Sequence, residues 1–273
     1  MKFLVFLSAM ILFMLPVAVV FPFTEEGLIV SATTLNFDFR EYDENSEQKL
    51  SEIGWIFGVK GQYKKAYDNL YLGAQYSFSK GLVKYDGETQ SGLEHVTQTD
   101  ETIHDGSIEI GRIYESWRLH DYAVIYLGAG MHRWIRDIKD KNNVAGLFET
   151  YTWAYLNIGA RGFIYRTENA FIMVEINVLR TLFPEIEVNY KGIFDNQTLD
   201  LGEHYGAKFA LPVRYRISNV IYLNIEPYWE SWDLGRSKHE PIKDDGVVTT
   251  GGVHEPRSAS RLFGLNIGVQ LLF

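Results

Sequence analysis

The sequence of 273 residues contains no cysteine, which excludes disulfide bonds, thiolate metal sites, cysteine nucleophiles and the lipid-modified cysteine of a lipoprotein. Proline is scarce, with seven residues, whereas 17 Tyr, 17 Phe and 6 Trp give an aromatic share of 15%, a composition that favours strands over helices. Basic residues are outnumbered 26 to 35 by acidic ones, and the net charge of -9 argues against a nucleic-acid partner. After residue 23 no apolar run reaches the roughly 18 to 20 residues that a membrane-spanning helix needs.

The N-terminus has the features of a secretory signal peptide, because Lys2 precedes an almost unbroken apolar stretch over residues 3–23. Cleavage is expected between residues 18 and 32. The small residues of Val30-Ser31-Ala32 fit the cleavage rule best, so residues 1–32 are predicted to be the signal peptide and residues 33–273 a single mature domain. Any cut in this window is expected to leave the first strand intact. The alternative is an uncleaved anchor helix.

A period of two in hydropathy dominates the mature chain. At the C-terminus the apolar residues of one face are Phe263, Leu265, Ile267, Val269, Leu271 and Phe273, and the residues between them are mostly small or polar. Such alternation is typical of a strand between two different environments. Similar segments predict about ten strands, at residues 33–42, 52–63, 69–82, 105–115, 122–137, 150–165, 170–183, 203–216, 220–233 and 258–273.

The connections between these segments alternate in length. Short turns rich in Asn, Asp and Lys are expected at residues 64–68, 117–121, 167–169 and 218–219, and longer polar connections at 43–51, 85–104, 138–148, 184–202 and 234–257. Short turns on one side and long loops on the other are typical of a closed antiparallel up-and-down transmembrane β-barrel. An even number of strands places both termini on the side of the short turns.

Alternation alone does not separate a membrane barrel from a secreted soluble β-protein, which would turn its apolar face inward. Glycines on the polar faces and aromatic residues near strand ends favour the membrane barrel. The outer apolar band is predicted to contain Leu35, Phe37, Phe57, Leu72, Ile125, Ile158, Val174, Phe209, Leu223 and Ile267.

Through its N-terminal segment, its strand rhythm and a closing run over residues 262–273 that ends in Phe, the chain resembles the bacterial outer-membrane β-barrel superfamily. The closing run resembles the signal read by the barrel-assembly machinery. The strand number is that of the class with omptin proteases and the Opc adhesin, but no motif matches either, so no site residue is carried over. The resemblance implies the outer membrane of a Gram-negative bacterium, long loops outside, termini in the periplasm, and outer-membrane lipids and the assembly machinery as partners.

Charged residues on the predicted polar faces are expected to line the barrel. The predicted lumen network consists of Asp38, Arg40, Lys60, Glu109, His132, Arg161, Glu175, Lys208, Arg214, Glu226 and Glu230. Because isolated buried charges are costly, these groups are expected to pair and plug the lumen. A selective passage for a small polar solute is the alternative. No cofactor and no metal site is predicted, and calcium or a basic ligand at the acidic loops is the only ion-binding interpretation.

Histidines fall in or beside the long loops, where the resemblance to omptins would place catalytic groups. His104-Asp105 and Asp244-Asp245 are adjacent pairs of the residue types such a protease uses, although neighbours on a strand point to opposite faces. No catalytic residue is therefore predicted. The sequence favours a non-enzymatic barrel, either a narrow or plugged channel or a loop-based binding or structural protein. The alternative is a hydrolase of lipids or peptides with its catalytic groups at the outer rim.

Overall fold

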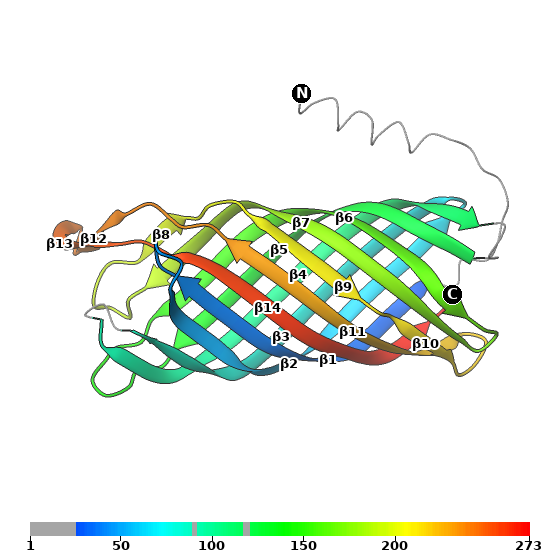
Figure 1. Ribbon diagram of the computed structural model, residues 1–273, viewed down its shortest axis with the longest axis horizontal. Coiled ribbons are helices and arrows are strands. Elements are labelled where there is room, and N and C mark those ends of the chain that lie inside the picture. The colour runs from blue at the N-terminus through cyan, green and yellow to red at the C-terminus, as the bar shows by residue number, and fades with distance from the viewer. Residues whose placement is uncertain (1–25, 89–91, 117–120) are drawn as a thin grey trace, which may run out of the picture.

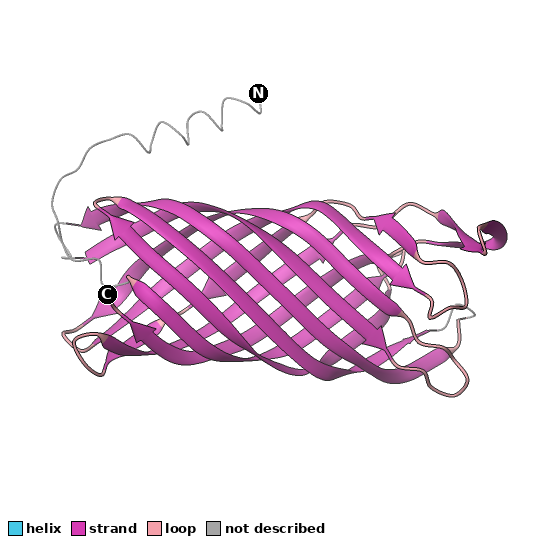
Figure 2. Cartoon of the chain, turned by 180° about the vertical axis from the view of Figure 1, so that it is seen from behind, coloured by secondary structure: helices cyan, strands magenta, loops and turns pink. Residues whose placement is uncertain are grey.

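The computed structural model describes residues 26–88, 92–116 and 121–273. Most of these residues lie in β-strands, and Figure 2 draws no helix among the described residues. Within the described ranges, no helix is long and apolar enough to cross a membrane. The strands are β1 (Gly27–Tyr42), β2 (Gln48–Tyr67), β3 (Leu70–Glu88), β4 (Glu94–Ser116), β5 (Asp121–Ile138), β6 (Phe148–Arg166), β7 (Ala170–Asn189), β8 (Gln197–Asp200), β9 (Tyr205–Ala210), β10 (Val213–Arg216), β11 (Ile221–Leu234), β12 (Glu240–Asp244), β13 (Val247–Val253) and β14 (Arg257–Leu271).

The wall is a closed barrel of ten antiparallel strands, which confirms the predicted fold (Figure 1). β1 pairs with β2 on one edge and with β14 on the other, and β14 pairs with β11, so no edge of the sheet is left open. β9 and β10 are two halves of one wall strand between β7 and β11, interrupted at Leu211 and Pro212. Proline donates no ladder hydrogen bond, which accounts for this break. β8 extends the wall beside the end of β7, and β12 with β13 forms a separate hairpin.

The two ends of the barrel differ. At one end, called the turn end here, strands are joined by short connections and both the start of β1 and the end of β14 are found (Figure 1). The other end, called the long-loop end, carries the hairpin of β12 and β13 and the connections around residues 43–47, 139–147 and 190–196. The predicted alternation of short and long connections is therefore observed. Some strands are longer than expected. β3 continues to Glu88 and β4 begins at Glu94, so the two strands take up most of the loop predicted at 85–104.

β1 begins six residues earlier than predicted. Leu28 pairs with both Tyr63 of β2 and Leu271 of β14, and the pairing on both sides continues through Ala32. A cut after Ala32 would therefore remove the first six residues of β1, contrary to the expectation that any cut in the window spares the first strand. Residues 1–25, which carry the signal-peptide prediction, lie outside the described residues.

The outer face carries an apolar belt. Of the ten residues predicted for it, Phe57, Ile125, Ile158, Phe209 and Ile267 have exposed side chains. Leu72, Val174 and Leu223 are partly exposed on the same face, so eight of the ten predicted positions face outward. The prediction is wrong for Leu35 and Phe37, which are 4% and 1% exposed and point into the barrel.

The physical reason is a change of environment along β1. Near the turn end the outward side chains are apolar, including Leu28 and Val30. Towards the long-loop end the inward side chains are apolar instead, namely Leu35, Phe37 and Phe39. This half of β1 therefore has an apolar inward face and a polar outward face, as the strands of a water-soluble barrel have. The apolar cluster inside this end of the barrel also contains Trp134, Tyr151, Trp153, Ile186 and Trp232 from other strands.

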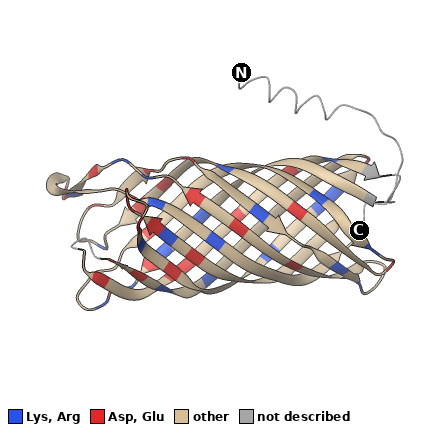
Figure 3. Ribbon diagram, in the orientation of Figure 1, with Lys and Arg blue, Asp and Glu red and all other residues tan. Residues whose placement is uncertain are grey.

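Glycines leave room for tyrosine rings in the lumen. A Cβ atom on Gly264 would overlap the ring of Tyr228, and one on Gly159 would overlap the ring of Tyr126. These inward glycines thus accommodate large neighbours on adjacent strands, as expected for a crowded lumen. The interior is filled by side chains, and charged positions occur along the strands as well as in the loops (Figure 3).

Candidate functional site in the barrel interior

Nearest the turn end, an ion pair joins β6 and β7. Arg161 and Glu175 are directly opposite each other, and Arg161 Nε donates to Glu175 Oε2 at 2.7 Å. Tyr126 Oη donates to the other carboxylate oxygen at 2.8 Å, and Asn177 Nδ2 donates to the same atom at 3.1 Å. Both charged side chains are almost fully buried, so Glu175 is held by an arginine and two further donors.

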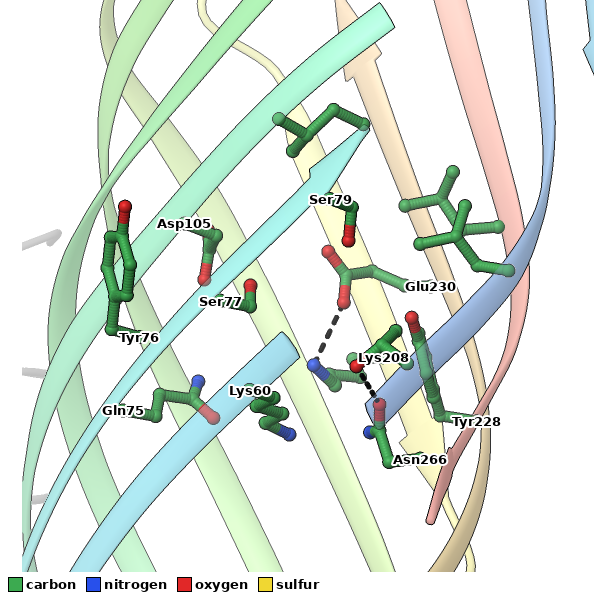
Figure 4. A pocket seen from close by; sticks show the side chains of 14 residues that line it. Lys60, Gln75, Tyr76, Ser77, Ser79, Asp105, Lys208, Tyr228, Glu230 and Asn266 are labelled. Atoms are coloured by element: carbon green, nitrogen blue, oxygen red, sulfur yellow. Dashed lines mark hydrogen bonds and ion pairs between the residues drawn. The ribbon is translucent and has the colours of Figure 1, made fainter. Parts of the chain in front are cut away.

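Two more ion pairs lie at the middle level of the lumen. Lys208 of β9 and Glu230 of β11 are direct cross-strand partners with an Nζ to Oε2 distance of 2.9 Å (Figure 4). Lys60 of β2 reaches Glu226 of β11 at 3.0 Å. Asn266 donates to the same Glu226 oxygen at 2.9 Å. Because β14 and β1 lie between β11 and β2 in the wall, the Lys60 pair crosses part of the lumen rather than a single strand junction.

The middle level also contains an aspartate-histidine pair. Asp105 Oδ2 lies 3.0 Å from His132 Nδ1, and Tyr155 Oη donates to Asp105 Oδ1 at 3.1 Å. The imidazole of His132 stacks on the ring of Trp153 at 4.2 Å between centroids and contacts Trp232 at 5.7 Å. Packing between two indoles keeps this histidine 4% exposed.

Towards the long-loop end the interior is dominated by carboxylates around one guanidinium. We call this group the mouth cluster, and it consists of Arg136, Glu41, Glu52, Glu101, Glu149 and Glu255. Arg136 donates from Nη1 to Glu149 at 2.7 Å and to Glu41 at 3.3 Å, and from Nε to Glu52 at 3.1 Å. The guanidinium also stacks over the ring of Phe39 at 4.6 Å. Arg136 is 1% exposed, so one fully buried cation connects strands β1, β2, β5 and β6.

The two remaining carboxyl groups of the mouth cluster are held by neutral donors. Trp134 Nε1 donates to Glu101, which lies directly opposite Arg136 on β4. Tyr151 Oη donates to Glu255 at 2.6 Å. Glu255 belongs to the connection between β13 and β14, so this bond ties the longest loop to the inner wall of the barrel.

The mouth cluster lies at the edge of the apolar belt, where most outward residues beside its members are polar, among them Arg40, Asp100 and Asp137. The cluster contains five carboxyl groups and one arginine, so its negative charges outnumber its positive charge when all the carboxyl groups are ionised. Burial raises the pKa of Glu255 well above its usual value, and the nearby Glu41 and Glu149 raise it further. Burial likewise outweighs the attraction of Arg136 and raises the pKa of Glu41 to about 7. Part of the cluster is therefore neutral at neutral pH.

Two small voids lie among the described side chains of the lumen. A cavity of about 40 Å³ lies beside Lys60, Asp105, Lys208 and Glu230 (Figure 4). A second cavity of about 20 Å³ shares Asp105, Lys208 and Glu230 with it and continues towards Glu175. Such volumes hold a few water molecules and nothing larger.

Most residues of the predicted lumen network do lie inside the barrel. Side chains that are buried or partly buried on the inner face are Lys60, Glu109, His132, Arg161, Glu175, Lys208, Arg214, Glu226 and Glu230. Glu109 accepts a hydrogen bond from Tyr71 at 2.8 Å, and Arg214 donates to Asn224 at 3.3 Å. The network consists of separate ion pairs, because Lys208 pairs with Glu230, Glu226 pairs with Lys60, and Arg161 pairs with Glu175.

Asp38 and Arg40 are on the opposite face from the one predicted. They pair with each other on the outside of β1 through two hydrogen bonds of 2.8 and 2.9 Å. The sequence pattern placed them inside because their charges were assumed to avoid lipid, but this part of β1 lies beyond the belt, where water solvates the outer face. The residues of the proposed assembly signal, Phe263, Leu265, Ile267, Val269, Leu271 and Phe273, lie on or at the end of β14 with exposed or partly exposed side chains.

The histidines of the loops do not form a catalytic group with a carboxylate. His204 Nδ1 lies 3.8 Å from Asp233, beyond hydrogen-bond distance. His104 is bonded to Tyr76 on the outer face at 2.8 Å, whereas Asp105 points inward, as expected for strand neighbours. Asp244 is the last residue of β12, and Asp245 lies in the turn between β12 and β13. His120 lies outside the described residues.

A larger cavity, of about 540 Å³, lies outside the lumen at the long-loop end. It is bordered by Asp43 and Glu44 of the connection between β1 and β2 and by His239 and His254 of the last long loop. The two imidazole rings are 4.0 Å apart between centroids. No group of three or more metal-ligating side chains occurs in the part of the chain that the structure describes. This surface is an open recess of the loops.

Sequence reasoning missed most of the mouth cluster. Glu101 was assigned to a loop, and Glu149 and Glu255 were placed in no group. Glu41 lay at the predicted end of a strand. The pairing of Glu101 with Arg136 and of Arg136 with Glu149 follows from strand register. A register is not readable from one sequence, so no signal was available beyond the unusual number of glutamates near the strand ends.

No protein-family model and no curated protein sequence matches the chain. Among solved structures, the outer membrane protease OmpT from Escherichia coli is similar with a TM-score of 0.60 and 12% identity, over 93% of this chain and 99% of that chain. The transport unit of the autotransporter AIDA-I from Escherichia coli has a TM-score of 0.43 and 8% identity, over 98% of this chain and 97% of that chain. The outer membrane protein OprG from Pseudomonas aeruginosa has a TM-score of 0.39 and 8% identity, over 90% of this chain and 95% of that chain. At 12% identity the likeness to OmpT concerns the fold alone, a closed antiparallel β-barrel.

Proposed function

We propose that this protein is an outer-membrane β-barrel of non-enzymatic type whose lumen is plugged by its own side chains and whose loops at the long-loop end form its binding or structural surface. The observation that carries the proposal is the filling of the lumen by paired charges at three levels, with voids of only about 40 and 20 Å³. Separating the partners of a buried ion pair leaves two unpaired charges in the barrel, which is costly. The pairs at each level therefore hold the lumen closed. Solutes larger than water are therefore excluded.

The outward belt supports the location in the membrane. Lipid-facing side chains of a barrel are apolar over a band about 25 Å tall, and a closed sheet leaves no unpaired backbone group in that band. The closed strand order and the exposed apolar residues fit both requirements. We further propose that the long-loop end faces the outside and the two termini face the periplasm, because short turns are periplasmic in outer-membrane barrels.

The alternative, a hydrolase, has its best support in the pair of Asp105 and His132, since a carboxylate that orients an imidazole is a common catalytic arrangement. Its surroundings argue against it. His132 is packed between Trp153 and Trp232, and the cavity beside Asp105 is too small for a peptide or lipid. A structural role for this pair is therefore preferred.

Single-channel conductance in planar lipid bilayers tests the proposal. The refolded protein is expected to give no porin-like steps. The double variant K208A/E230A removes both partners of an inward pair and leaves no orphan charge, so it is expected to enlarge the adjoining voids and raise the current. The double variant D38A/R40A removes an outward pair of the same kind and is the matched control. Large steps from the unmodified protein would exclude a plugged lumen.

A further inference from the structure

Arg133 differs from its neighbours on the outer face in having no partner. It lies on β5, its side chain is exposed, and within the described residues no hydrogen bond or ion pair holds its guanidinium. Several other outward cations near the long-loop end are neutralised. Arg40 is bound by Asp38 at 2.8 Å, Arg180 by Glu203 at 2.9 Å, and Lys80 lies 3.4 Å from Asp100. An exposed arginine without a counterion is available for a ligand.

The residues beside Arg133 extend the polar site over three strands. Strand register places His104 of β4 and Thr152 of β6 directly opposite Arg133, one on each side. Directly opposite residues have Cβ atoms about 5 Å apart, so one small anion can reach all three side chains. Tyr76 Oη is 2.8 Å from His104 Nδ1, and the imidazole also contacts the ring of Phe78 at 5.1 Å. When Tyr76 donates to Nδ1, Nε2 carries the hydrogen and is a donor to an anion.

The height of this row on the barrel indicates the kind of anion. Towards the turn end the next outward residues on the same strands are Gly106, Met131 and Ala154, and Met131 is 63% exposed. One step further on β4 and β6 come Ile108 and Leu156, which are 67% and 47% exposed. His104, Arg133 and Thr152 are thus the first hydrogen-bonding row beyond the belt, at the level of lipid headgroups. Guanidinium binds phosphate through two parallel hydrogen bonds. A lipid seated here would place its acyl chains along the belt and its phosphate on Arg133.

We propose that His104, Arg133 and Thr152 bind the phosphate group of an anionic membrane lipid in the leaflet that adjoins the long-loop end. The site rests on the proposed membrane location of the barrel. It does not depend on whether the lumen conducts, so its test is independent of the conductance measurement.

Native mass spectrometry tests the site on the full mature protein refolded in micelles containing phosphatidylcholine and phosphatidylglycerol. The wild-type protein is expected to retain phosphatidylglycerol, and R133Q to retain about tenfold less, as expected for loss of one charge-assisted contact. R40Q is the matched control, because it removes an outward arginine that Asp38 already neutralises. H104A is the second variant, and it is expected to weaken retention as well.

Heat-modifiable mobility on gels establishes that each variant has folded, so a loss of lipid is not confused with loss of the barrel. Equal retention by folded wild-type protein, R133Q and H104A overturns the site while the membrane barrel stands. Displacement of the lipid by an equal concentration of inorganic phosphate overturns the lipid assignment, because a free anion would then suffice. Failure of the wild-type protein to fold in micelles or vesicles contradicts the proposed membrane location itself.

Discussion

Lys60 and Glu226 are 166 residues apart in the chain and meet inside the barrel, with 3.0 Å between Nζ and Oε1. Their side chains are 8% and 4% exposed, and they belong to β2 and β11, which do not pair with each other. The ion pair therefore exists only once the barrel has closed through β14 and β1. Asn266 donates to the same carboxylate oxygen. The lumen charges thus contribute to closure as well as to plugging.

Replacing Lys60 with Met tests the contribution of this pair. The variant is expected to lose about 3–5 kcal/mol of unfolding free energy, because Glu226 remains buried without its closest cation. Urea unfolding in detergent micelles measures the change. The double variant K60M/E226M is expected to recover most of the loss, since both charges are then replaced by apolar groups. D38A/R40A, which removes an exposed pair, is expected to change stability by about 0–1 kcal/mol.

Replacing Glu175 with Ala tests the level nearest the turn end. Arg161 then loses the carboxylate 2.7 Å from its Nε, and Tyr126 and Asn177 lose an acceptor. We expect destabilisation of about 3–5 kcal/mol, far more than for an exposed glutamate such as Glu47. The melting temperature of refolded protein and its bilayer conductance are measured together. A variant that melts like the parent and passes ions no differently would contradict the paired plug.

The mature N-terminus is expected at or before Gly27. Residues 28–32 pair on both sides with β2 and β14, Gly27 pairs with β2, and Glu26 accepts a hydrogen bond from Lys65 at 2.9 Å. Cleavage after Ala32 would leave the last residues of β2 and β14 without their β1 partners, which lipid does not tolerate. Intact mass measurement of the protein purified from membranes gives the cleavage site. A mature chain that starts at Thr33 and still folds would show that these pairs are dispensable.

Deleting Phe273 is expected to lower the yield of assembled barrel. Phe273 stacks on Tyr63 of β2 at 5.7 Å, and Lys65 Nζ lies 5.8 Å above its ring. The residue is therefore well placed to hold the end of the chain against the first strands, in addition to its predicted role in the assembly signal. Heat-modifiable protein in the membrane fraction is compared between the deletion and F273W, which keeps an aromatic ring. Equal yields from the deletion and the parent would contradict the role.

The strand count and the belt could be predicted because both depend on local alternation. Residues 263–273 alternate so regularly that their outward face was assigned correctly. The same reasoning failed on β1, where the apolar phase shifts from Leu28 and Val30 to Leu35 and Phe37. That shift marks the edge of the lipid belt. The shift is visible in the sequence, but the alternation of one strand does not by itself show where the wall leaves the belt.

The charge pairs could be predicted only by residue type. Alternation shows that Lys208 and Glu226 are inward, but the partner of each depends on strand register and on which strands approach across the lumen. The mouth cluster illustrates the same limit. Glu255 joins it through a loop of some twenty residues whose path the hydropathy pattern does not describe, and it is the bond to Tyr151 that brings it inside.

The stability of the mouth cluster should depend on pH. The pKa of Glu41 is raised to about 7 from 4.5, mainly by burial, and Glu255 is shifted in the same direction. A carboxyl group with a raised pKa in the folded state contributes stability that is complete below its unfolded pKa and is lost as pH rises through its folded pKa. The contribution of Glu41 is therefore expected to decline from about pH 4.5 to about pH 7, by about 3 kcal/mol.

Urea unfolding in micelles across this pH range measures the effect. E41Q is expected to flatten the decline, because the amide still accepts from Arg136 Nη1 and does not titrate. E47Q changes a carboxylate of the exposed connection between β1 and β2 and is the control. Since ionised Glu41 repels Glu149 and Glu52, the loss of stability should be accompanied by loosening of the loop held by Glu255. Proteolysis of residues 235–256 is expected to accelerate as pH rises in the parent protein and less so in E41Q, whereas equal pH profiles for parent and E41Q would exclude Glu41 as the titrating group.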